Sequence, residues 1–358
     1  MPKKIITIGS ATFDIFVKTN QQGVMKFSTP QGHEKWLCLE HGGKITLDNV
    51  VETFGGGATN TAVSFARKGF DAWFVGKIGA HYGDQVIENL EKGGVKTNHV
   101  KKTKEDRTGF STIISTFDGD RTVLLYPGAN RLFDAKDLPI HALEQTDWIF
   151  LNHLSKEKNT ISKALLKILQ RKKQVKLAWN PGHEQLRQGV EKWKALLART
   201  EILFLNKEEA AQFTGISYKI PDIKKDIPRK NSYSSRYFLP PYASDVRQIF
   251  KTFFKYGVKY VAITDGANGA QASDGKQLYF SPVVSRKRVD TLGAGDGFAS
   301  GFTAARMQAK SLRTALLYGT LDANAVVSCY GAQKGLLTLK ELQGEAQKAD
   351  LKISSTPL

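Results

Sequence analysis

Short apolar runs alternate with amphipathic helical patterns along the second half of the chain. The runs at 147–152, 175–182, 201–206 and 260–266 are typical of buried strands, and segments with helix-like periodicity separate them. Strands in such an alternation lie parallel in one sheet, with helices on both faces. The sequence therefore predicts an α/β fold built on a mainly parallel central sheet.

Two segments in the first half interrupt this alternation. Residues 36–54 and 108–126 each have the pattern of two strands, joined around Gly42–Gly43 and Asp118–Gly119. Hairpins do not fit a regular succession of strand and helix. We therefore expect them to form a separate small β-sheet that serves as a lid or an interface.

The chain has 358 residues, enough for one large domain with an attached subdomain. We expect a single domain over residues 1–358, with the lid strands inside about 14–54 and 104–130. Residues 216–244 contain four prolines and four tyrosines among many charges. This composition predicts a long loop or an insertion there.

Charge and cysteine content limit the partners. The formal net charge of +18 favours a basic surface that attracts anionic small molecules. Nucleic acid is the other partner that such a charge suggests, but neither a zinc-finger spacing nor an RNA-binding aromatic motif accompanies it, so we do not expect nucleic acid as the main partner. No apolar run approaches the length of a membrane span, and the two cysteines lie far apart. We expect a reducing, cytoplasmic setting without membrane contact.

The stretch DTLGAGDGFASGF, at 290–302, is glycine-rich but fits neither of the two common phosphate-binding motifs. It lacks the lysine of a P-loop, and no P-loop motif occurs elsewhere in the chain. A dinucleotide fingerprint is approached only by GGGATN, where Asn60 stands at the place of the third glycine. A different kind of anion site is needed to explain these glycines.

Gly293, Ala294 and Gly295 open a helix of small residues. The first amides of a helix have no internal partner and its dipole is positive there, so this turn suits a phosphate group. Asp296 puts a carboxylate at the same place, where it would repel the phosphate unless it took a proton from an attacking hydroxyl. From these residues alone, a helix-capping role for Asp296 remains the alternative.

Two signatures in order carry a resemblance to a known family. The segment 290–302 resembles a C-terminal signature of the form D-T-x-G-A-G-D, and 55–69 with 75–84 resembles the N-terminal signature of the same family. The sequence thus resembles the PfkB family of carbohydrate kinases, over nearly the whole chain except 216–244. The resemblance implies a ribokinase-like fold with a β lid, and ATP-dependent phosphorylation of a hydroxyl on a small sugar or nucleoside.

The resemblance also implies roles for single residues. Asp296 would be the general base, and the anion hole would be formed by Gly293, Ala294 and Gly295. The acceptor would be bound by Asp14, Gly56, Gly57 and Asn60. The nucleotide, its phosphates and Mg²⁺ would be held by Asn206, Glu209, Thr264, Gly266 and Asn324, with Glu209 reaching the metal through water. Asp290 and the carbonyl of Leu292 resemble a monovalent-cation loop, which would bind K⁺.

Other readings stay open at this point. The protein could be a purine nucleoside kinase of the same fold, or a non-catalytic relative that binds a sugar or nucleotide. An intact Asp296 argues against the second, because a pure binder gains nothing from a carboxylate beside phosphate. Asp14 could cap a turn, Asn60 could bond only backbone, and Glu209 could be an exposed helix charge.

Two further expectations come from the resemblance. His81 stands where the N-terminal signature commonly has aspartate, a position that is not central to the chemistry. Lids of this family often pair between subunits, and free sheet edges tend to pair. We therefore expect a homodimer through the strands of 36–54 and 108–126.

Overall fold

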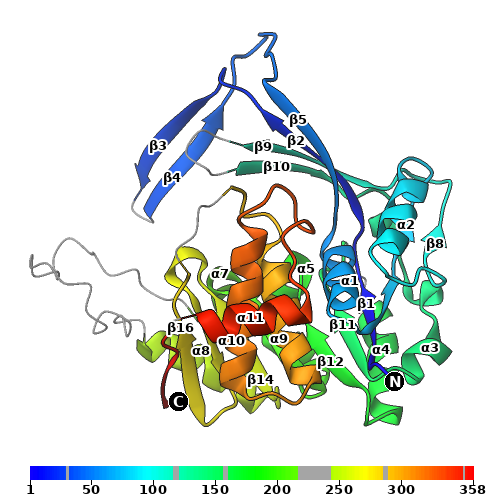
Figure 1. Ribbon diagram of the computed structural model, residues 1–358, viewed down its shortest axis with the longest axis vertical. Helices are drawn as coiled ribbons and strands as arrows, with labels where there is room; N and C mark the ends of the chain where they lie inside the picture. Colours follow the sequence, from blue (N-terminus) through cyan, green and yellow to red (C-terminus); the bar gives the residue numbers. More distant parts are fainter. Residues whose placement is uncertain (30–31, 116–120, 156–159, 217–242, 285–288, 350) are drawn as a thin grey trace, which may run out of the picture.

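The computed structural model describes residues 1–29, 32–115, 121–155, 160–216, 243–284, 289–349 and 351–358. In this part of the chain, a nine-stranded sheet has the order β17-β16-β15-β14-β13-β12-β11-β1-β6 (Figure 1). Its parallel strands are β6 (Asp71–Val75), β1 (Lys4–Ile8), β11 (Trp148–Leu151), β12 (Lys176–Trp179), β13 (Thr200–Asn206) and β14 (Tyr260–Thr264). The antiparallel strands are β15 (Ala270–Ser273), β16 (Gln277–Ser281) and β17 (Ser354–Pro357). The predicted mainly parallel sheet is confirmed.

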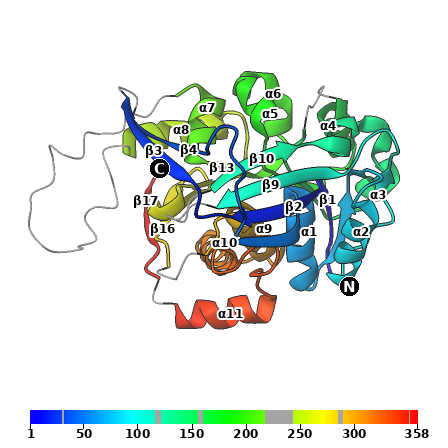
Figure 2. The same ribbon diagram turned by 90° about the horizontal axis from the view of Figure 1, so that it is seen from above.

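Helices cover both faces of this sheet (Figure 2). One face carries α3 (Ile140–Glu144), α4 (Thr160–Arg171), α5 (His183–Arg187), α6 (Gly189–Leu197), α7 (Lys207–Thr214) and α8 (Ala243–Lys255). The other carries α1 (Gly57–Arg67), α9 (Ala294–Met307), α10 (Leu312–Val326) and α11 (Leu339–Lys348). Successive strand residues serve opposite faces, so Ile149 packs in one core and Phe150 in the other. Burial of both faces explains the unbroken apolar runs in the sequence.

Shorter elements complete the chain. Helix α2 (Gly83–Lys92) packs beside α1, and strands β7 (Lys77–Ile78) and β8 (Lys101–Lys102) pair with each other. The described residues also form the 3-10 turns η1 (Gly128–Leu132), η2 (Ala135–Asp137) and η4 (Gly266–Asn268). None of the helices in the described ranges combines the length and apolarity that a membrane crossing would require.

A second sheet forms the lid. Its strand order is β10-β9-β2-β5, with β2 (Thr12–Lys18), β5 (Asn49–Gly55), β9 (Gly109–Ser115) and β10 (Arg121–Tyr126). Since β1 leads directly into β2, this sheet rises from the carboxyl edge of the central sheet (Figure 1). The pairing of β9 with β10 confirms the predicted hairpin at 108–126, whose turn at Asp118–Gly119 lies outside the described residues.

The hairpin predicted around Gly42–Gly43 is wrong. Residues 39–48 contain no strand; β4 (Gly32–Cys38) pairs with β3 (Gly23–Thr29) instead. Strand β5 pairs along its whole length with β2, from Thr12 opposite Gly55 to Lys18 opposite Asn49. A partner inside a larger sheet buries more backbone and side-chain surface than a neighbour across a short turn. The predicted insertion at 216–244 lies almost wholly outside the described residues.

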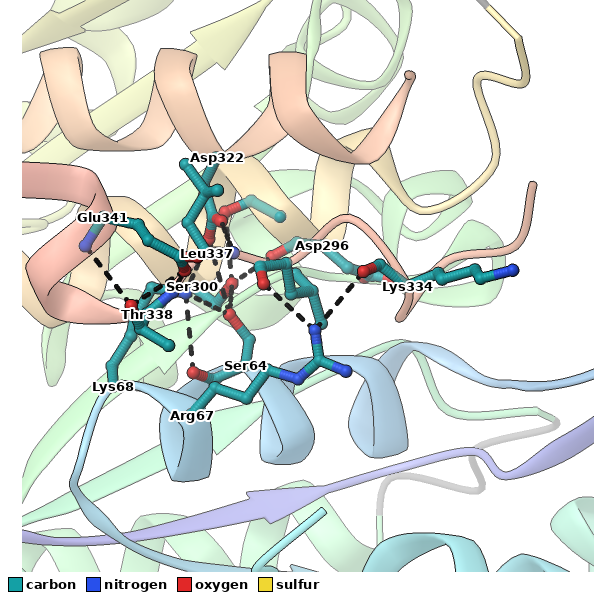
Figure 3. A network of polar contacts seen from close by, with 12 residues as sticks. Ser64, Arg67, Lys68, Asp296, Ser300, Asp322, Lys334, Leu337, Thr338 and Glu341 are labelled. Carbon is teal, nitrogen blue, oxygen red and sulfur yellow. Dashed lines mark hydrogen bonds and ion pairs between the residues drawn. The ribbon is translucent and has the colours of Figure 1, made fainter. Parts of the chain in front are cut away.

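A buried ion pair ties three helices of one layer together (Figure 3). The Lys68 ammonium lies 2.7 Å from the Asp322 carboxylate, and both side chains are 0% exposed. Lys68 also donates to the Ser64 hydroxyl, which lies 2.7 Å from that of Ser300. Burial lowers the pKa of Lys68, and Asp322 acts against this. Since these residues come from α1, α9 and α10 or follow directly after them, the pair fixes how the three helices meet.

Removing one partner should leave the other charge buried and unpaired. We expect Lys68→Met to lower the free energy of unfolding by about 3–5 kcal/mol, and Lys68→Met with Asp322→Leu to cost less than that. Urea unfolding measures both. Lys92→Met is the matched control, because its pair with Glu88 has side chains 73% and 64% exposed and should contribute about 0–1 kcal/mol. Equal costs for Lys68→Met and Lys92→Met would contradict this account.

Candidate functional site

Asp296 and Asn60 meet where α9 and α1 pack together. Asp296 lies in the first turn of α9, and its Oδ2 accepts a hydrogen bond of 2.8 Å from Asn60 Nδ2. Burial raises the pKa of Asp296 to about 6, while the Asn60 bond lowers it. The carboxylate is thus ionised at neutral pH yet has high proton affinity, which suits a general base. The side-chain hydrogen bond of Asp296 links α9 to α1 instead of closing the first turn of α9. The side chain of Asn60 bonds other side chains, while its backbone amide bonds the carbonyl of Gly56.

The glycines before Asp296 differ in what requires them. Gly293 has φ 79°, and a Cβ there would lie 2.4 Å from the Cβ of Ala332. A Cβ on Gly295 would meet nothing within 4 Å. Packing and backbone conformation therefore demand the first glycine, whereas the second leaves open space next to the amides that begin α9 at Ala294. That space fits an anion at the helix N-terminus.

Asp14 lies on β2 with an unsatisfied oxygen. The residue is 4% exposed, and its Oδ1 is buried without a hydrogen-bond partner among the described residues. Burial raises the pKa of Asp14, against hydrogen bonds from Thr12 and Ser111. A Cβ on Gly55 would lie 1.8 Å from Asp14 Oδ2, so only glycine fits there. A buried acceptor oxygen of this kind suits a ligand hydroxyl.

Gly57 faces both the Asp296 carboxylate and a second unsatisfied oxygen. A Cβ on Gly57 would lie 3.1 Å from Asn152 Oδ1 and 3.3 Å from Asp296 Oδ1. Asn152 is 2% exposed, and its Oδ1 has no partner within the described part of the chain. Gly56 has a reason of its own, since its φ is 101° and a Cβ would lie 2.5 Å from the carbonyl of Ser10.

Sequence reasoning missed Gly55 and Asn152. Asn152 directly follows β11, so it stands at the carboxyl edge of a buried parallel strand, which is where ligands bind in open α/β sheets. The position of Asn152 at the end of a buried parallel strand was the signal in the sequence that could have identified it. Gly55 offered none, because its need for glycine comes from a carboxylate 41 positions earlier in the chain.

Asn206 and Glu209 bond each other at the start of α7. Asn206 Oδ1 accepts from the Glu209 amide at 2.7 Å, and Glu209 Oε2 accepts from the Asn206 amide at 2.8 Å. This capping box uses one oxygen of each side chain. Glu209 is half-buried, so it is not an exposed helix charge, and burial raises its pKa. Asn206 lies opposite Thr264 in the pairing of β13 with β14, which brings both to the same sheet edge.

Gly266 and Asn324, the other two residues expected to bind the nucleotide, differ in their surroundings. A Cβ on Gly266, at φ 50°, would meet nothing within 4 Å. Asn324, on α10, is 5% exposed, and its Nδ2 is buried without a partner in the described ranges. A buried amide donor can bond a ring nitrogen of a nucleobase, and a glycine with open space beside it lets a ligand approach the backbone closely.

Asp290 organises the loop before the anion site. Its Oδ1 accepts from the Leu292 amide at 3.0 Å, and its Oδ2 from the Gly331 amide at 3.3 Å. Arg121 of the lid donates to the Thr291 hydroxyl, so the lid touches this loop. No group of three or more His, Cys, Asp or Glu side chains that could hold a metal occurs among the residues described.

Comparison with known proteins identifies the family. Residues 29–339 match the model described as pfkB family carbohydrate kinase. The chain belongs to the pfkB family. It is therefore a kinase that transfers a phosphate group to a hydroxyl, as its two signatures predicted.

The alignments of this pfkB kinase with its relatives cover most of both chains. The ribokinase of Bacillus subtilis is 24% identical over 352 residues, which cover 95% of this chain and 98% of that protein. A structure of Arabidopsis thaliana ribokinase complexed with ribose and ATP has a TM-score of 0.73 at 20% identity, covering 97% of this chain and 99% of the other. A nucleoside kinase of Methanocaldococcus jannaschii has a TM-score of 0.70 at 19% identity, covering 97% and 99%. These likenesses confirm the ribokinase-like fold.

The raised pKa of Asp296 makes a prediction about stability. An acid whose pKa is 3.8 when exposed and about 6 in the folded protein binds more protons when folded, so stability falls as pH rises through this range. We expect Asp296→Asn to raise the free energy of unfolding by about 1–3 kcal/mol at pH 7. The gain stays in this range because Asp296 is only half-buried, so solvent screens part of the penalty on its charge.

The gain from Asp296→Asn should shrink as pH falls from 7 toward 4, because wild type then becomes protonated too. Urea unfolding of both proteins across this range measures the difference. Asp84→Asn, in the first turn of α2 with a side chain 84% exposed, is the matched control and should show no such gain. A gain independent of pH would mean that the charge of Asp296 is not its source.

Proposed function

We propose that the protein transfers the γ-phosphoryl group of Mg²⁺–ATP to a hydroxyl of a ribose-type sugar, with Asp296 as the general base. The observation that carries the proposal is the desolvated Asp296 carboxylate, whose pKa is raised to about 6, in the first turn of α9. Similarity to ribokinases along nearly the whole chain supports a sugar acceptor. Purine nucleosides remain an acceptor class for the same chemistry, and the assay must include them.

The acceptor would lie between the lid and the start of α1. Hydroxyls of a sugar donate hydrogen bonds, and the oxygens of Asp14 and Asn152 that have no partner in the described ranges would accept them. Gly57 presents no side chain toward Asn152 and Asp296, so the acceptor can approach the base there. We assign Asn60 and Gly56 to the same acceptor site, with Asn60 already bonded to Asp296.

The reaction would then follow from positions and charge. Asp296 takes the proton of the acceptor hydroxyl, whose oxygen attacks the γ-phosphorus while the bond from phosphorus to the ADP oxygen breaks. The amides of Gly293, Ala294 and Gly295 stabilise the charge on the transferring group. When bound, Mg²⁺ neutralises phosphate charge, and the oxygen of Glu209 outside the capping box would reach it through water.

The remaining residues would serve nucleotide and cation. Thr264 and Asn206 share a sheet edge, so we assign both to the phosphate side of ATP. The open space at Gly266 suits the nucleotide, and the Nδ2 of Asn324, which no described residue bonds, suits the adenine. Asp290, with the Leu292 carbonyl, would bind K⁺, because each carboxylate oxygen retains a lone pair beside its backbone bond.

Asp296→Asn tests the base. Asparagine keeps the shape of the side chain but takes no proton, so we expect turnover to fall by at least about 10²-fold. ATP affinity should change by less than about tenfold and improve slightly, because a negative charge near the γ-phosphate is removed. The measurement is ADP release and ATP binding of both proteins.

The acceptor for this comparison comes from a panel of sugars and purine nucleosides assayed with Mg²⁺–ATP. Asp84→Asn again serves as the control and should keep wild-type turnover. Near-normal turnover of Asp296→Asn would rule out the base. Activity of the wild type on nucleosides alone would overturn the sugar assignment while leaving the mechanism intact.

We also propose that the lid joins two copies of the chain. Large apolar side chains are exposed on the lid, with Leu124 and Leu125 at 56% and Val50 at 51%. The two-stranded sheet β3-β4, which lies between β2 and β5 in the chain, exposes two more, Trp36 at 58% and Met25 at 50%. An exposed apolar surface of this kind marks an interaction site. A second copy of the chain offers the matching apolar surface on the same strands.

Light scattering at micromolar concentration should therefore give the mass of a dimer. Leu124→Glu places a charge in the proposed interface and should shift the protein to monomers without changing its melting profile at low concentration. Glu at an exposed site away from the lid, Ile140→Glu, is the control, since Ile140 is 38% exposed. A monomeric wild type would contradict the proposal.

A further inference from the structure

Three side-chain amides form a line that ends at the Asp296 carboxylate. Asn89 Nδ2 donates to Gln333 Oε1 at 2.9 Å, and Gln333 Nε2 donates to Asn60 Oδ1 at 3.1 Å. Asn60 Nδ2 in turn donates to Asp296 Oδ2 at 2.8 Å. Gln333 and Asn60 each accept with the oxygen and donate with the nitrogen, so the line has one direction. It ends on a group that, when ionised, only accepts.

The backbone around Gln333 is anchored to the ends of α1 and α10 (Figure 3). The Arg67 guanidinium, from α1, donates to the carbonyl of Lys334 at 3.4 Å. The Leu337 amide donates to Asp322 Oδ1 at 2.9 Å, and Asp322 is the partner of the buried Lys68. These contacts hold the segment that carries Gln333 against the helix that carries Asn60.

Asn60 needs such a partner because its amide has two orientations of similar shape. In one, an N–H faces Asp296; in the other, the Asn60 oxygen faces the ionised carboxylate and repels it. Asn60 is 4% exposed, so water contributes little to the choice. The hydrogen bond from Gln333 to the Asn60 oxygen favours the first orientation.

We propose that Gln333 is a positioning residue for the reaction: its Nε2 fixes the Asn60 amide so that a donor, not an acceptor, faces the catalytic carboxylate. This inference rests on the proposed role of Asp296 as the base. A carboxylate held by one donor on Oδ2 keeps its other oxygen, Oδ1, directed toward Gly57, where the acceptor hydroxyl would lie. Gln333 thus acts on the chemistry without touching a substrate.

Two substitutions of Gln333 separate positioning from packing. Gln333→Glu keeps the size of the side chain but only accepts, so Asn60 must turn its N–H toward Glu and its oxygen toward Asp296. Gln333→Leu removes the hydrogen bond and leaves both orientations of Asn60 accessible. We expect kcat to fall about 10–100-fold in Gln333→Glu, and less in Gln333→Leu, with KM for ATP within about threefold of wild type.

A packing role predicts the opposite order, because glutamate preserves the shape of glutamine and leucine does not. Lys334→Ala is the matched control on the neighbouring residue. Its exposed side chain takes no part in the amide line, so kcat should stay at the wild-type value. Equal or larger loss in Gln333→Leu than in Gln333→Glu would overturn the proposal.

A stability cycle tests the same proposal without an assay of activity. An amide at position 296 can turn to suit either orientation of Asn60, so Gln333→Leu should destabilise Asp296→Asn less than it destabilises wild type. We expect this coupling to be at least about threefold in the unfolding equilibrium constant at pH 7. Additive effects within error would overturn the positioning role. If the wild type phosphorylates no acceptor of the panel, the proposed function fails, yet the cycle still decides whether Gln333 orients Asn60.

Discussion

The desolvation of one carboxylate, Asp296, constrains the rest of the site. Burial raises its pKa toward neutrality and costs folding free energy, so a donor must be supplied from another element. That donor, Asn60, stands 236 positions earlier in the chain, and only the packing of α1 against α9 brings the two together. Ser300 joins this contact to the fold, since its hydroxyl donates to the Asp296 carbonyl and contacts Ser64 of α1.

The small residues that follow Asp296 serve this packing rather than the proposed phosphate site. A Cβ on Gly301 would lie 2.7 Å from the Tyr318 carbonyl, and one on Gly297 would lie 3.0 Å from a methyl group of Val326. Helix α10 therefore approaches α9 closely, which places Asp322 where it can pair with Lys68. The glycines of one short stretch thus divide by function: Gly295 leaves room for a ligand, and the later ones leave room for a helix.

The sequence allowed prediction of those features whose signals are local. The alternation of strands and helices, the start of α9 and the place of Asp296 all follow from periodicity and glycine positions within a few residues. Gln333 and Asn60 are 273 positions apart, and a pattern of burial does not specify which buried amide meets which. The false hairpin around Gly42–Gly43 has the same origin, because a turn signal says nothing of the competing partner β2. Which residues meet over such long separations in the chain is settled only by the packing of the core.

Three carboxylates near the proposed anion site differ in how far the protein satisfies them, and this grading matches their proposed use. Both oxygens of Asp290 accept backbone amides, so it shapes a loop and keeps only the remaining lone pairs for the proposed K⁺. Asp14 receives side-chain hydrogen bonds but keeps one buried oxygen without a partner in the described chain, which leaves capacity for a ligand hydroxyl. Asp296 has a single side-chain donor among the residues described and a pKa raised to about 6, which leaves capacity for a proton. A fold that satisfied all three fully would be more stable, but it would retain no oxygen with which to bind an alcohol or deprotonate it.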